Sequence, residues 1–76
     1  MDLINHIKQH RARLDMTQHQ LAERIGVRRQ TIIAIEKGYY VPSALLVFRI
    51  ARELGMKVDG LFELTNDGAG SEEENG

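Results

Sequence analysis

The chain has 76 residues, of which 42% are hydrophobic and 28% charged, with a net charge of −1 and no cysteine. This length allows one small domain, and the composition excludes a disordered chain, a disulfide-stabilised core and a thiolate metal site. The longest apolar run, residues 44–48, is too short for a signal sequence or a membrane span, so we expect a cytoplasmic protein with no membrane association.

The first helix is predicted close to the N-terminus, where residues recur at helical spacing. One face of this helix would hold Leu3, Ile4, Ile7, Arg11 and Leu14. Asp2 and Asn5 both suit the N-cap, and the sequence leaves the choice open. No segment alternates apolar and polar residues as a strand would, so an all-α fold of five helices is predicted.

Two further helices follow, separated by a tight turn. Thr17 with Gln20 three residues later forms a capping-box pattern that begins the second helix, and Gly26 ends it. The third helix is predicted over residues 28–37. Gly38 stands where a helix commonly closes through a left-handed residue.

The fourth helix begins after the N-cap Ser43 and continues to Leu54. A short fifth helix starts at Asp59 or a neighbour and holds Leu61 and Phe62. Beyond it, Gly, Ala, Ser, Asn and acidic residues leave nothing to bury. We therefore predict a domain over residues 1–64 and an acidic, disordered tail over residues 65–76.

Charge is distributed unevenly between these parts. Up to residue 60 the chain carries ten basic and six acidic side chains, a net charge of +4, whereas the last sixteen residues carry five acids and no base. The overall charge is thus an average over a basic module and an acidic tail, and the basic part suits a nucleic-acid partner.

The fourth helix has more apolar residues than one core face needs. That face would hold Ala44, Leu46, Val47, Ile50, Ala51 and Leu54. Leu45 and Phe48 fall on the remaining side, and a two-fold interface is the usual way to cover such residues. Cover by the tail or by local curvature of the chain is the alternative. The predicted homodimer interface consists of Leu45, Phe48, Leu61, Phe62 and Leu64.

Residues 17–37 meet the steric demands of a helix-turn-helix. A small residue is needed where the two helices cross, and Ala22 stands there. The turn needs a residue that tolerates a left-handed backbone, and Gly26 stands there. Five more positions must be apolar to join the pair to the core, and they hold Leu21, Ile25, Val27, Ile32 and Ile35. Agreement at all seven positions is a specific indication of this motif.

The outer face of the third helix carries groups that suit DNA. Arg28, Arg29 and Gln30 lie in its first turn, where a recognition helix meets base edges. Arginine can form a bidentate pair with guanine, and glutamine with adenine. Thr31 would reach a phosphate or a base, and Gln18 would offer amides to a phosphate. Without the surrounding motif, the arginines would be interpreted as a solvated helix face.

Ile33 and Ala34 lie further along the same outer surface. An exposed isoleucine lowers solubility unless it touches another apolar group, such as a thymine methyl. Tyr39 and Tyr40 follow the helix, and their hydroxyls suit phosphates; packing around Pro42 is the alternative.

The stretch MTQHQLAERIGVRRQTIIAIEKGYYVPSALLVFRIARELG closely resembles the phage repressor and Cro-type helix-turn-helix family, also called the xenobiotic response element family of bacterial regulators. The resemblance covers residues 5–63 and includes RQTI, AIE, YxPS and a closing LF. It implies a five-helix repressor-like domain that binds pseudo-palindromic operators as a homodimer. The residues it would place on the DNA are Gln18, Arg28, Arg29, Gln30 and Ala34.

The same resemblance implies an ion pair between Arg11 and Glu36, which would lock the first helix to the end of the recognition helix and leave the arginine near a phosphate. A surface ion pair of little energetic value is the alternative. Two departures stand out: the family often has serine or threonine in place of Arg28, and usually leucine in place of Ala44. Capping of the third helix and local packing are expected to be weaker.

Two hypotheses about function follow. The leading one is a transcriptional regulator, a repressor that binds a double-stranded DNA operator as a homodimer through contacts that include Arg11 and Tyr39. The second is an antitoxin-like or adaptor module that uses the same fold to bind a partner protein through Leu45, Phe48 and the tail. An enzyme is not predicted, since the chain lacks a phosphate loop and a nucleophile pattern. His6 and His10 have no third ligand nearby, so no metal or cofactor is expected.

Overall fold

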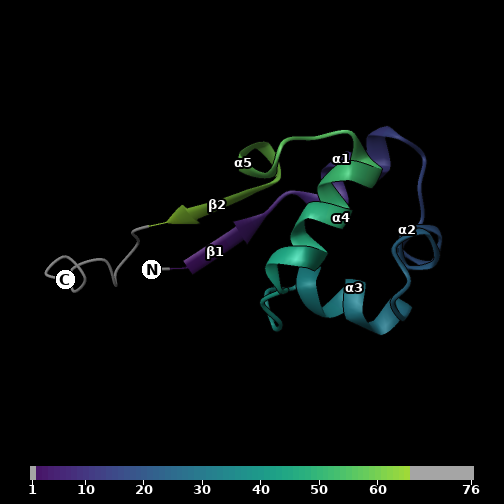
Figure 1. The fold of residues 1–76 in the computed structure, drawn as a ribbon, viewed down its shortest axis with the longest axis horizontal. Coiled ribbons are helices and arrows are strands. Elements are labelled where there is room, and N and C mark those ends of the chain that lie inside the picture. The colour runs from purple at the N-terminus through teal and green to yellow at the C-terminus, as the bar shows by residue number, and fades with distance from the viewer. Residues whose placement is uncertain (1, 66–76) are drawn as a thin grey trace, which may run out of the picture.

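The computed structural model describes residues 2–65 (Figure 1). In chain order the elements are β1 (Asp2–Asn5), α1 (Ile7–Arg13), α2 (Gln18–Ile25), α3 (Arg29–Glu36), α4 (Ala44–Leu54), α5 (Val58–Leu61) and β2 (Phe62–Thr65). The predicted disordered tail lies outside the described residues except for Thr65, which belongs to β2. Among these elements, no helix is long and apolar enough to cross a membrane.

The five predicted helices are present, and the capping residues fix their ends. The Thr17 hydroxyl accepts a hydrogen bond from the Gln20 amide at 3.0 Å, and the Gln20 side chain accepts one from the Thr17 amide at 2.8 Å, so the capping box is complete. Ser43 caps α4 through the amide of Leu46 at 3.2 Å. Gly26, in the turn after α2, has a φ of +77°, as the motif requires.

The prediction of an all-α fold is wrong in one respect, because the two ends of the domain form a small sheet. β1 and β2 pair antiparallel, with Leu3 opposite Leu64 and Asn5 opposite Phe62. The strands lie side by side at one end of the molecule, and α1 to α4 gather at the other (Figure 1). Four-residue strands whose partners lie about sixty positions apart leave only a weak local pattern.

The predicted first helix therefore starts too early. Leu3 and Ile4 belong to β1, and α1 begins only at Ile7. Neither proposed cap occupies the N-cap, which is His6 and makes no side-chain cap bond. Asn5 nevertheless takes part, because its Oδ1 accepts a hydrogen bond from the Ile7 amide at 3.2 Å.

The core lies among α1, α2, α3 and α4 and extends to α5 and β2. Four of the five apolar positions expected in the helix-turn-helix are buried, and the fifth, Val27, packs against the core. On α4 the expected face is confirmed except at Ala44, which is exposed, while Val47 is half-buried. The buried core residues are Ile7, Leu21, Ala22, Ile25, Ile32, Ile35, Leu46, Ile50, Ala51, Leu54, Leu61 and Phe62.

The burial of Leu61 and Phe62 corrects the predicted homodimer interface. Their exposed fractions are 0% and 7%, so both side chains stabilise the domain's own core and offer no surface to a second copy. Leu45, Phe48 and Leu64 remain exposed at 69%, 63% and 65%. Of the predicted interface, these three side chains remain available to a partner.

Candidate nucleic-acid interface

The helix-turn-helix consists of α2, a short turn and α3. Ala22, 1% exposed, lies at the contact between the two helices, and the amide of Val27 donates to the carbonyl of Ala22 at 3.0 Å. The left-handed Gly26 turns the chain between them. Ile32 and Ile35 hold α3 to the core, so the opposite side of α3 is turned outward.

The start of α3 presents the polar groups that the sequence predicts. Arg28 is the N-cap in an extended conformation, and its side chain makes no cap bond, as expected from the departure at this position. Arg29 and Gln30 follow in the first turn, and both are exposed. Thr31 and Ala34 are half-buried. A guanidinium and an amide at the free end of a helix suit the edges of bases in a major groove.

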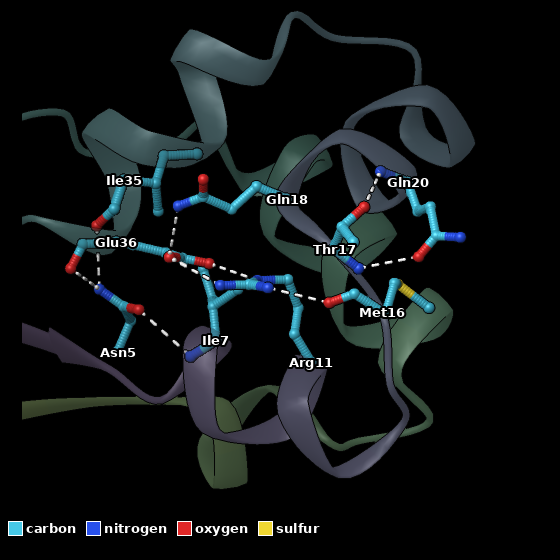
Figure 2. A network of polar contacts seen from close by, with 9 residues as sticks. All are labelled: Asn5, Ile7, Arg11, Met16, Thr17, Gln18, Gln20, Ile35 and Glu36. Atoms are coloured by element: carbon cyan, nitrogen blue, oxygen red, sulfur yellow. Dashed lines mark hydrogen bonds and ion pairs between the residues drawn. The ribbon is translucent and has the colours of Figure 1, made fainter.

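Arg11 and Glu36 form the ion pair that the family resemblance implies. Arg11 donates from Nε to Oε2 of Glu36 at 2.7 Å and from Nη2 to Oε1 at 3.2 Å (Figure 2). Their side chains are 11% and 8% exposed, so this is not the weak surface pair considered as the alternative. Arg11 also donates from Nη1 to the carbonyl of Met16 at 2.8 Å.

Gln18 joins the same carboxylate. Its Nε2 donates to Oε1 of Glu36 at 3.1 Å, so the first residue of α2 is tied to the last residue of α3 (Figure 2). Glu36 thus accepts hydrogen bonds from α1 and from α2 while it belongs to α3. This carboxylate fixes the mutual position of the three helices behind the outward side of α3.

Asn5 has a role that the sequence analysis missed. Its Nδ2 donates to the carbonyl of Ile35 at 2.9 Å, at the C-terminal end of α3, while its Oδ1 accepts from Ile7 in α1 (Figure 2). One amide side chain therefore satisfies backbone groups at two helix ends. The sequence offered only its suitability as a cap, because the carbonyl it contacts lies thirty residues away.

Other candidate residues lie apart from this network. Tyr39, just beyond α3, is 81% exposed, and Tyr40 is 46% exposed. His6 and His10 have different partners: His6 Nε2 lies 2.7 Å from Oε2 of Glu63, and Nδ1 of His10 lies 3.2 Å from Nη2 of Arg13. Within residues 2–65, no group of three or more potential metal ligands comes together.

Residues 7–61, from the start of α1 to the end of α5, match the helix-turn-helix family model. The chain belongs to the Cro/C1-type helix-turn-helix family. The family consists of DNA-binding transcriptional regulators, and this membership confirms that the chain is not an enzyme.

Similar proteins share nearly the whole domain. An uncharacterised helix-turn-helix-type transcriptional regulator of Methanothermobacter thermautotrophicus is 56% identical over 64 residues, which are 83% of this chain and 93% of the relative. The regulator YgzD of Bacillus subtilis is 46% identical over 63 residues, 83% of this chain and 96% of the relative. A crystal structure of a Bacteroides fragilis protein considered to bind DNA superimposes with a TM-score of 0.73 at 26% identity, covering 80% of this chain and 98% of that one.

Proposed function

We propose that the protein is a sequence-specific repressor that binds a pseudo-palindromic operator as a homodimer, with α3 in the major groove. The observation that carries this proposal is the first turn of α3. The Arg28 side chain makes no cap bond to this turn, and Arg29 and Gln30 are exposed in it. The buried contact between α2 and α3 holds the turn in place. A recognition helix meets base edges with this end.

Specificity is assigned to the exposed side chains of that turn. Arg29 suits O6 and N7 of guanine, and Gln30 suits N6 and N7 of adenine. Each well-formed bidentate pair discriminates against a wrong base by about 1–3 kcal/mol. Ala34, one turn further along α3, is small enough to let the helix approach the bases.

Affinity is assigned to phosphate contacts around this turn. Arg28 is exposed at the start of α3, Tyr39 is exposed three residues beyond its end, and Thr31 lies in its first turn. Gln18 directs its side chain to Glu36, so its contribution to a phosphate comes from the backbone amides at the start of α2. Arg11, mostly buried, keeps this end of α1 in place and leaves two guanidinium N–H groups outside the bonds described above.

Dimerisation is assigned to Leu45 and Phe48 on α4, with Leu64 on β2. Each is more than three-fifths exposed, which is unusual for three large apolar side chains on so small a domain. A self-complementary patch covers such residues in a two-fold dimer. The dimer would then place two α3 helices in successive major grooves and repress by occluding a promoter.

Selection of bound fragments from random double-stranded DNA tests the proposal. We expect a palindromic consensus whose half-sites are about one helical turn apart. Arg29→Ala should lower affinity for the consensus by roughly ten- to a hundredfold and affinity for random DNA much less. Arg52→Ala is the control, because this exposed arginine lies in the last turn of α4, at the end away from α3 (Figure 1).

Recovery of no sequence preference would overturn the proposal. The hypothesis of a module that binds a partner protein with the same fold would then take its place. Equal losses on consensus and random DNA for Arg29→Ala would leave DNA binding intact and remove this residue from base recognition.

A further inference from the structure

A groove of about 660 Å³ runs beside α3 and is not explained by the contacts assigned so far. Its walls come from α1, the start of α2 and the second half of α3. Lys8, Gln18, Ile33, Glu36 and Lys37 are among its lining residues. From the sequence, Gln18 was predicted to contact a phosphate and Ile33 was placed on the outer surface of α3, whereas Lys8 and Lys37 were not assigned to the DNA interface.

The rim of this groove is positively charged. Lys8 and Lys37 are both exposed. The carboxylate that also lines the groove, Glu36, is 8% exposed and bonded to Arg11 at 2.7 Å, so its charge is compensated. The net effect is an open channel that attracts an anionic chain.

Ile33 lies in this channel without a place in the hydrophobic core. The neighbouring isoleucines of α3, Ile32 and Ile35, are 0% and 2% exposed and belong to the core, whereas Ile33 is half-buried and lines the groove. It lies one helical turn after Arg29 and one turn before Lys37, on the outward side of α3. A branched apolar side chain is thus flanked along the helix by two cations.

We propose that this groove receives one strand of the operator, with phosphates at Lys8 and Lys37 and the 5-methyl group of a thymine against Ile33. The inference rests on the proposed function and extends it to base preference. Thymine is chosen because it alone among the four bases presents a methyl group in the major groove. An apolar contact with that methyl removes Ile33 from water without requiring a hydrogen bond.

Replacement of thymine by deoxyuridine tests this contact, because it removes only the methyl group. On the consensus duplex selected above, one thymine of a half-site should show a loss of about fourfold in affinity, as expected for one buried methyl group. Ile33→Ala should abolish that difference at this position and at no other. Ile33→Val, which keeps the branch, should retain most of it.

The lysines are tested by the salt dependence of binding to the same duplex. Lys8→Ala and Lys37→Ala should each reduce the slope of log affinity against log salt by about one, as loss of a phosphate contact does. The melting temperature of every variant is measured beside its affinity, so that unfolding is not mistaken for weaker binding. Unchanged slopes would exclude these lysines from the phosphate contacts and overturn their part of the proposal.

The inference about Ile33 is overturned if the wild-type protein binds the consensus and its deoxyuridine derivatives equally. The same outcome follows if the loss persists undiminished in Ile33→Ala. Both results need a protein that binds DNA specifically, so they differ from a failure of the proposed function, in which no consensus would be recovered at all.

Discussion

Arg11 and Glu36 lie twenty-five positions apart in the chain, yet their side chains meet in a two-bonded ion pair at 2.7 and 3.2 Å with almost no access to solvent. The pair joins α1 to the last turn of α3, and Gln18 adds a third bond from α2. One carboxylate thus joins α1 and α2 to the recognition helix, beside the apolar contacts of Ile32 and Ile35 with the core.

Removal of either partner should destabilise the fold strongly. Arg11→Met leaves Glu36 buried and without its cation, and we expect the free energy of unfolding to fall by about 3–5 kcal/mol, as for other broken buried pairs. Urea unfolding followed by circular dichroism measures the loss. A change below about 1 kcal/mol would show that the pair behaves as a solvated one.

The double variant Arg11→Met with Glu36→Leu separates the ion pair from the packing. With both charges removed, no buried charge is left unpaired, so the double variant should be more stable than Arg11→Met alone. The decrease in its free energy of unfolding relative to the wild type measures what the ion pair contributes beyond packing. Simple addition of the two single losses would contradict this account.

Gly26 and Asp15 both have a left-handed backbone conformation, so substitutions at the two positions test backbone strain in opposite directions. An added Cβ at Gly26 would meet nothing within 4 Å, so Gly26→Ala tests the φ of +77° alone, and we expect a loss of about 1–2 kcal/mol. Asp15, in the turn between α1 and α2, has a φ of +54° with a side chain present. Asp15→Gly should therefore stabilise the domain, by up to about 1 kcal/mol. If both substitutions shifted the melting temperature in the same direction, backbone strain would not explain their effects.

The sequence predicted the helix-turn-helix well because its determinants are local. The capping box joins Thr17 to Gln20, and a single glycine, Gly26, sets the turn. The sheet was missed because β1 and β2 have only four residues each and pair across the whole domain. The spacing of Leu3, Ile4 and Ile7 also fits a helix, and only the distant partner Leu64 decides between the two.

The residues of the candidate site were likewise predicted only in part. Exposed residues in the first turn of α3 follow directly from helical spacing, so Arg29 and Gln30 were found. Burial of Leu61 and Phe62 depends on how α5 and β2 fold back on the core, which the apolar pattern alone does not determine. The bond from Asn5 to the end of α3 likewise has no sequence pattern, because it joins distant elements.

Phe48→Glu should convert the proposed dimer to a monomer without loss of the fold. Phe48 is 63% exposed, so a charge there costs the isolated domain little, whereas at an apolar interface it remains unpaired on both copies. Sedimentation at micromolar concentration measures the change. Arg49→Glu, an exposed neighbour on α4, is the control for altered charge. A wild-type protein that sediments as a monomer, unchanged by Phe48→Glu, would exclude this interface.

We expect Arg28 to raise the affinity for DNA at the expense of the stability of the fold. Its backbone has the extended conformation of an N-cap, but its side chain makes no cap bond. Arg28→Ser would supply a hydroxyl for the amides of the first turn, and we expect a gain of about 1 kcal/mol in the free energy of unfolding. The same change removes a cation from the start of α3, so affinity for DNA should fall and the salt slope should decrease by about one.

Arg28→Ala distinguishes the two effects of that substitution. Alanine removes the charge and supplies no cap, so it should lower DNA affinity as serine does while leaving the urea midpoint below that of Arg28→Ser. If both variants bind DNA as tightly as the wild type, Arg28 has no phosphate contact. If serine brings no more stability than alanine, its hydroxyl does not improve on the present arrangement, in which the Thr31 amide donates to the Arg28 carbonyl at 2.9 Å.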